Sequence, residues 1–205
     1  MSKGIEIPPH LVSAWQPASD SWSMTLATYA SRFIQEMERR YGERDRRWTY
    51  VGVAFHDDVP QLWFPGSREI PPRMHIAISL GRLAFSRREN AVYQLAHECV
   101  HLLTPVVGGG APVIEEGLAT VFSEDMLEFW CNYPDKQALT QDPRYMSAAA
   151  SVRQLLVLEP DAIRQLRRIE PAFEHMTAET FSRAGLNVPM PLVATLLAVF
   201  PAKNV

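Results

Sequence analysis

The sequence has little cysteine: only Cys99 and Cys131 occur among its 205 residues, and they are not spaced as a Cys-x-x-Cys pair. This scarcity excludes a disulfide scaffold and argues against a thiolate metal site or a thiol redox site. An excess of charge of one sign is also lacking, because 23 acidic residues nearly balance 20 basic ones and the formal net charge is −3. Without a basic field to attract phosphates, we expect the chain not to bind nucleic acid.

Long hydrophobic runs are missing as well. The most apolar stretch, residues 192–200, lies between Pro191 and Pro201 and is far shorter than the roughly 20 residues that cross a bilayer. At the N-terminus, Pro8 and Pro9 interrupt the chain before the apolar region of a secretion signal could form. We therefore expect no membrane association and a cytoplasmic location.

The residues that are present predict an α+β fold. Apolar residues at three- or four-residue steps predict an amphipathic helix over residues 24–41. Aromatic and β-branched residues predict strands over 48–55, 61–64 and 74–80, and the first two are expected to form a hairpin across the turn-rich residues 57–60. A small N-terminal sheet of about three strands thus precedes a mostly helical half.

The helical half begins with a pattern that favours a helix start. Ser86 and Glu89 have the spacing of a capping box, which predicts a helix over residues 86–104. Three glycines at 108–110 predict a linker, because glycine is the most flexible residue. A second helix is then expected over residues 112–131, with proline in its first turn.

The rest of the chain is also expected to be helical. Asp142 predicts the start of a third helix that runs to residue 158. Shorter helices are expected over residues 161–169, 178–184 and 190–199. We expect residues 1–205 to form one domain, within which residues 134–205 could make a helical C-terminal subdomain. The sequence predicts no oligomeric state.

The sequence lacks the serine-hydrolase elbow, the phosphate loop and the dinucleotide-binding turn. It contains one motif that indicates a catalytic site. Residues 97–101 read His-Glu-Cys-Val-His, or HExxH, on a predicted helix. Residues four apart are separated by about 400°, so His97 and His101 share one face and can ligate one metal ion. Glu98 lies about 100° round the helix from His97, close enough to reach a metal-bound water. Cys99 points away into the core.

Two histidines do not complete a catalytic zinc site, which needs a third protein ligand and an open position for water. Glu115 and Glu116 follow in the first turns of the next helix. If the two helices are antiparallel, one of these carboxylates lies across the histidine face. Position alone does not choose between Glu115 and Glu116.

The segment HECVHLL, followed by IEEGLATVFSE, resembles the zinc core of the gluzincin metallopeptidases, in particular their aminopeptidase branch, over about residues 86–130. The resemblance selects Glu116 as the third zinc ligand and places Glu115 where the family usually has asparagine. It implies a zincin-like peptidase domain, in which an edge strand of the sheet binds the substrate. That role falls here on residues 74–80.

The sequence departs from the family in three respects. The connection from His101 to Glu116 is shorter than the family generally has. Where the family carries an acidic residue that orients a zinc histidine, this chain has Ser123, and Thr120 or Glu124 are the candidates to replace it. The motif that recognises a free substrate N-terminus is missing, so exopeptidase specificity is not indicated.

The resemblance also implies an activity, the zinc-dependent hydrolysis of peptide bonds in a peptide or protein substrate. With Zn²⁺ held by His97, His101 and Glu116, the pKa of a coordinated water falls towards about 7. Glu98 is then the general base, and it passes the proton to the leaving amine.

A hydrolytic site also needs a donor for the oxyanion, which gluzincins supply from a downstream tyrosine or histidine. Tyr133, Tyr145 and His175 are the candidates. Tyr145 is preferred, because the third helix can bring it back over the site.

Two other functions are compatible with the same residues. A short chain leaves little material for the second wall of a substrate cleft, so the scaffold could instead be a partner-binding or regulatory protein with structural or lost metal. The same site could also hydrolyse a non-peptide amide or ester, which the sequence does not distinguish.

Overall fold

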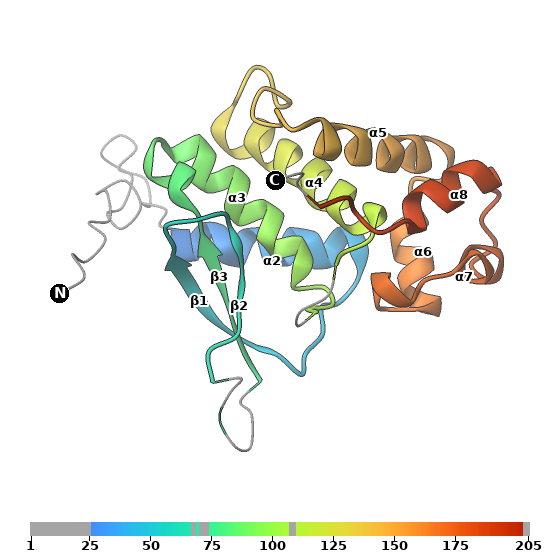
Figure 1. Ribbon diagram of the computed structural model, residues 1–205, viewed down its shortest axis with the longest axis horizontal. Helices are drawn as coiled ribbons and strands as arrows, with labels where there is room; N and C mark the ends of the chain where they lie inside the picture. The colour runs from blue at the N-terminus through green and yellow to red at the C-terminus, as the bar shows by residue number, and fades with distance from the viewer. Residues whose placement is uncertain (1–25, 67–68, 70–73, 107–109, 203–205) are drawn as a thin grey trace.

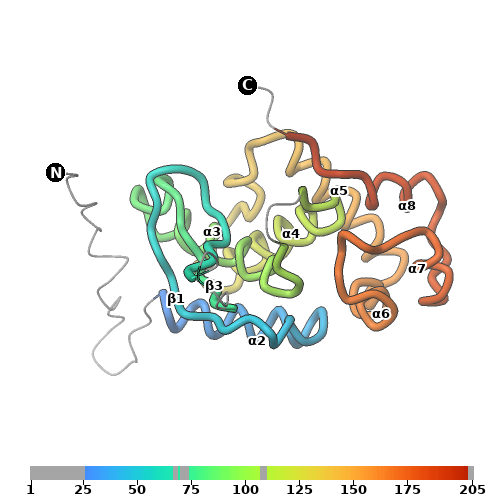
Figure 2. Tube along the Cα trace, turned by 60° about the horizontal axis from the view of Figure 1, so that its bottom comes forward, coloured from blue at the N-terminus to red at the C-terminus, as the bar shows by residue number. Residues whose placement is uncertain are grey.

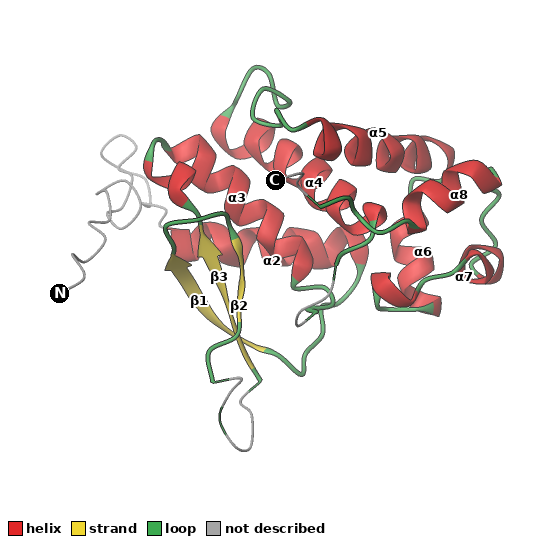
Figure 3. Ribbon diagram, viewed as in Figure 1, coloured by secondary structure: helices red, strands yellow, loops and turns green. Residues whose placement is uncertain are grey.

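The computed structural model describes residues 26–66, 69, 74–106 and 110–202, and it has the α+β fold that the sequence predicts (Figures 1 and 3). A small mixed sheet precedes a mostly helical region. The elements are α2 (Leu26–Tyr41), β1 (Thr49–Phe55), β2 (Gln61–Trp63), β3 (His75–Leu80), the 3₁₀ turn η1 (Arg82–Phe85), α3 (Arg88–His101), α4 (Val113–Cys131), α5 (Pro143–Leu158), α6 (Ala162–Ile169), the 3₁₀ turn η2 (Phe173–His175), α7 (Ala178–Arg183) and α8 (Met190–Leu197). Among the described residues, no helix is long and apolar enough to cross a membrane.

The sheet has the order β1-β3-β2, so the predicted hairpin between the first two strands is wrong. β3 lies between them, parallel to β1 and antiparallel to β2. All residues of β3 after His75 are buried. This suits a central strand, which is covered more completely than an edge strand. The connection from β1 to β2 crosses the end of β3 at Gly81, where a Cβ atom would collide with the backbone oxygen of Asp58.

The start of α3 also differs from the prediction. No side chain caps this helix, whose N-cap residue is Arg87. Ser86 instead donates a hydrogen bond to the carbonyl oxygen of Leu83 and accepts one from Asn90. The Ser86 hydroxyl is therefore bonded to the preceding 3₁₀ turn and does not form the predicted capping box. The helix ends at His101, three residues before its expected end.

The later helices match their predicted positions within about two residues. Pro112 is the N-cap residue of α4, and Asp142 caps α5 by accepting a hydrogen bond from the backbone N–H of Arg144. The predicted glycine linker falls largely on residues 107–109, which lie outside the described residues. The start of the first predicted helix, at Met24, also lies outside them.

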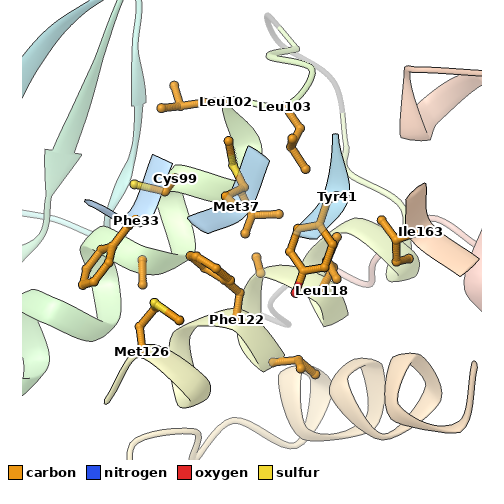
Figure 4. Packing of buried hydrophobic residues seen from close by; sticks show 14 of the residues in the cluster. Phe33, Met37, Tyr41, Cys99, Leu102, Leu103, Leu118, Phe122, Met126 and Ile163 are labelled. Atoms are coloured by element: carbon orange, nitrogen blue, oxygen red, sulfur yellow. The ribbon is translucent and has the colours of Figure 1, made fainter. Parts of the chain in front are cut away.

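The core lies where the sheet, α2, α3 and α4 meet, and α5 covers the far side of α4 (Figures 1 and 2). Phe33 of α2 and Phe122 of α4 pack edge to face, with ring centroids 6.5 Å apart. Cys99 faces this core, as predicted, and is fully buried (Figure 4). The buried apolar residues form one cluster that continues into α6, α7 and α8. This packing holds α3 and α4 side by side.

Candidate metal centre

His97 and His101 lie one turn apart at the C-terminal end of α3. Their ring centroids are 5.2 Å apart, and both side chains line the same cavity. The backbone is α-helical through both residues, so the four-residue spacing places the two imidazoles on one face as predicted.

Glu116 brings a carboxylate to these histidines from the first turn of α4. Its Oε2 atom lies 3.2 Å from Nε2 of His97 and 3.9 Å from Nε2 of His101. The three possible ligand atoms all lie within 4.8 Å of one another. Within the described part of the chain, this is the one group of three such side chains that can hold a metal ion.

Glu115 contacts the other side of the His101 ring. Its Oε1 atom lies 2.7 Å from Nδ1 of His101, and the Glu115 side chain is almost fully buried. A carboxylate that accepts a hydrogen bond from Nδ1 leaves Nε2 free to bind a metal, which is how metal-binding histidines are commonly oriented. The adjacent glutamates therefore have different positions: Glu116 joins the possible ligand group, and Glu115 orients one of its histidines.

Residue order alone did not reveal this role for Glu115, and the two residues expected to fill it, Thr120 and Glu124, make other contacts. Thr120 donates a hydrogen bond to the backbone oxygen of Glu116, within α4. Glu124 is buried, where it accepts a hydrogen bond from Thr140 and pairs with Arg153. The signal that could have found Glu115 is its position, since neighbouring residues at a helix start differ by about 100° and can face two sides of one histidine pair.

The charges around the site favour a cation there. Burial opposes protonation of His101, but the hydrogen bond to Glu115 and the charge of Glu116 raise its pKa to about 10. Burial also opposes ionisation of Glu116, yet the hydrogen bond with His97 and the charge of His101 lower its pKa to about 2. The carboxylates thus stabilise positive charge at the imidazoles, which a bound metal ion can supply as well as a proton.

Glu98 lies in the same cavity, next to the possible ligand group but not part of it. Its side chain is buried, and burial raises its pKa. The cavity has a volume of about 460 Å³. The carboxylate of Glu98 is therefore available to water or to a ligand that enters the cavity.

The structure brings one of the three candidate oxyanion donors to the site. Tyr145, in the first turn of α5, lines the cavity, and its ring centroid lies 5.6 Å from that of His97. Tyr133 instead accepts a hydrogen bond from Arg87, at the opposite end of α3. The His175 side chain is 66% exposed and lies in η2, away from the cavity. Burial raises the pKa of Tyr145, so its hydroxyl stays protonated at neutral pH.

The strand beside the site is β2 rather than the predicted residues 74–80. Those residues form β3, which pairs with a strand on each side and has no free edge. Among the described residues, β2 pairs with β3 alone, and residues in and next to β2 line the cavity: Pro60, Gln61, Leu62 and Phe64. The unpaired edge is available to an extended backbone.

Comparison with protein-family models, with curated proteins and with solved structures found no match to this chain. The function of the chain must therefore be inferred from the side chains of the site and their geometry.

Proposed function

We propose that this chain is a zinc-dependent peptidase whose hydrolytic centre is formed by α3 and α4. The observation that carries the proposal is the convergence of His97, His101 and Glu116 on one point of a cavity that also contains the buried carboxylate of Glu98. The similarity of the HExxH and EGLAT segments to those of gluzincin peptidases supports the same function.

The donor set suits a catalytic zinc ion better than a structural one. Structural zinc sites generally have four protein ligands, whereas catalytic sites have three and leave a position for water. Two imidazoles and one carboxylate meet here, beside a cavity. When bound, zinc supplies a Lewis acid for the scissile carbonyl and lowers the pKa of a coordinated water towards about 7.

Glu98 has the environment that a general base requires. Because burial raises its pKa, this carboxylate accepts a proton near neutral pH more readily than an exposed glutamate does. It takes the proton from the attacking water and delivers it to the leaving amine nitrogen, which returns Glu98 to its ionised form. Glu98 lies on the same helix as His97 and His101, and this keeps its carboxylate beside the reacting atoms.

Tyr145 and β2 contact the substrate. The protonated hydroxyl of Tyr145 donates a hydrogen bond to the oxyanion that develops on the scissile carbonyl. The free edge of β2 binds the substrate backbone in an extended form. Leu62, Phe64 and Val106 line the cavity and favour an apolar side chain next to the scissile bond.

The test combines metal content with hydrolysis. The purified chain, a His97→Ala/His101→Ala variant and a Glu98→Gln variant are analysed for zinc and incubated with a peptide mixture, and the products are read by mass spectrometry. We expect about one zinc per chain in the natural protein and in Glu98→Gln, and none in the double variant. Peptide cleavage should fall at least ~100-fold in Glu98→Gln, the lower part of the range for general-base catalysis.

Two results contradict the proposal. Cleavage that survives in Glu98→Gln shows that this residue is not the base. Zinc binding without cleavage of any peptide, ester or other amide favours a partner-binding protein with structural metal, whereas cleavage of a non-peptide amide or ester alone keeps the mechanism and changes the substrate.

A further inference from the structure

The C-terminal segment returns to the start of the helix that carries Glu116 (Figures 1 and 2). Val199 forms an antiparallel β-bridge with Pro112. The backbone N–H of Val113 donates to the oxygen of Ala198, at 2.8 Å, and the N–H of Phe200 donates to the oxygen of Ala111, at 2.9 Å. No side chain caps α4, so Ala198 satisfies one of the N–H groups that a helix start leaves without a partner.

This attachment places the Phe200 side chain on Tyr145. The two ring centroids are 4.7 Å apart, with an interplanar angle of 48°. The guanidinium of Arg144 lies 5.5 Å from the Phe200 ring and 5.7 Å from the Tyr145 ring, and it donates a hydrogen bond to the oxygen of Pro201. Asp142 forms an ion pair with that guanidinium, with 2.6 Å between Nη2 of Arg144 and Oδ2 of Asp142. The Arg144 guanidinium is therefore fixed in place against both aromatic rings.

Phe200 does not itself line the metal cavity, whereas Tyr145 does. The same Tyr145 ring meets His97 in the cavity and Phe200 outside it. The backbone hydrogen bonds of residues 198–200 do not depend on the side chain at position 200. What the phenylalanine adds is contact with Tyr145 and Arg144, in the tilted arrangement that stabilises aromatic pairs beyond their burial.

We infer that Phe200 is a positioning residue, which holds the phenol ring of Tyr145 against His97 by packing on it from the C-terminal segment. This inference rests on the proposed function, because it acts through the residue assigned to the oxyanion. A displacement of about 1 Å in a catalytic group can cost on the order of 100-fold in rate. The C-terminal segment then supports the hydrolytic site from outside the cavity.

The test is a double-mutant cycle between the two rings. Phe200→Ala should lower kcat about 10-fold with KM nearly unchanged and zinc content intact, and Tyr145→Phe should lower kcat more. In the Tyr145→Phe background, Phe200→Ala should cost no further activity, because its effect passes through the lost hydroxyl. Phe200→Tyr keeps the ring and should retain activity. Val199→Ala is the matched control, since Val199 lies in the same segment with a 71% exposed side chain.

A second measurement separates this inference from the proposed function. Crystal structures of Phe200→Ala, the milder Phe200→Leu and Val199→Ala measure the distance between the ring centroids of Tyr145 and His97, which is 5.6 Å here. We expect the Tyr145 ring to move by about 1 Å or more in Phe200→Ala and Phe200→Leu, and to stay in place in Val199→Ala. If no variant hydrolyses peptides but the ring moves, the proposed function fails and the positioning stands. An unmoved ring, or losses of kcat that simply add, overturns the positioning role.

Discussion

Glu115 accepts a hydrogen bond from Nδ1 of His101, at 2.7 Å, while the neighbouring Glu116 faces Nε2 of His101 and of His97. Two consecutive residues of α4 thus lie next to the two ring nitrogens of one imidazole. The arrangement holds the His101 ring with Nε2 turned towards His97 and Glu116, the other members of the possible ligand group.

Removal of the Glu115 carboxylate should weaken zinc binding without removing a ligand. We expect Glu115→Ala to lower zinc affinity 10- to 100-fold, the usual effect of losing a carboxylate behind a metal-binding histidine, and Glu115→Gln to lower it less because the amide oxygen still accepts from Nδ1. Competition with a chelator of known affinity measures this. Glu128→Gln, a 61% exposed glutamate on the same helix, is the control. Equal affinity in Glu115→Ala and the control contradicts the role.

Zinc should stabilise the fold. The carboxylates that converge on His101 repel one another less when a divalent ion is present, and binding to the folded state alone adds about 2.7 kcal/mol when free zinc is 100 times its Kd. Thermal unfolding should therefore occur at a lower temperature after chelation and recover when zinc is returned. In His97→Ala/His101→Ala the unfolding temperature should not respond to either treatment. A response in that variant would place the stabilising ion elsewhere.

Gly117 should not tolerate a larger side chain, although it lies inside a helix. Alanine favours helices by about 1 kcal/mol over glycine. A Cβ at this position, however, would collide with the backbone oxygen of Ala148 on α5. Such overpacking typically costs about 1–3 kcal/mol. We expect Gly117→Ala to reduce the free energy of unfolding in urea by about 1 kcal/mol net, and to reduce kcat because α5 carries Tyr145. A gain of stability would show that α4 and α5 are less closely packed.

Arg167 should be important for stability rather than for catalysis. It is buried on α6, and it donates hydrogen bonds to the backbone oxygens of Tyr41, Glu43 and Leu103, which lie at or just after the ends of α2 and α3. Burial lowers its pKa to about 10, so it stays charged at neutral pH. Arg167→Met removes all three side-chain hydrogen bonds, although the oxygen of Leu103 still accepts from the backbone N–H of Asp45, and should cost about 3 kcal/mol of unfolding free energy. The exposed neighbour Arg168 supplies the control: Arg168→Met should change stability by less than about 0.5 kcal/mol.

Local patterns predicted most of the elements. The helix predicted over residues 142–158 is correct at both ends within one residue. Its start was predictable because the Asp142 cap and Pro143 act on the backbone next to them. The predicted capping box at Ser86 was wrong, since the 3₁₀ turn before α3 uses the same hydroxyl. The predicted hairpin was wrong for a different reason: chain neighbours need not pair when a more apolar strand can take the centre of the sheet.

Residue order alone is enough to put His97 and His101 on one face, because four residues make about one turn of any α-helix. It also placed a glutamate pair at the start of the next helix. The resemblance selected Glu116, and Tyr145 was the preferred oxyanion donor, but the distances that bring both residues to His97 come from tertiary packing. The same packing puts Glu115 against His101 and places β2 beside the cavity, which no sequence pattern indicated. These outcomes depend on how α3, α4, α5 and the sheet pack against one another, and spacing along the chain does not contain the distances between separate elements.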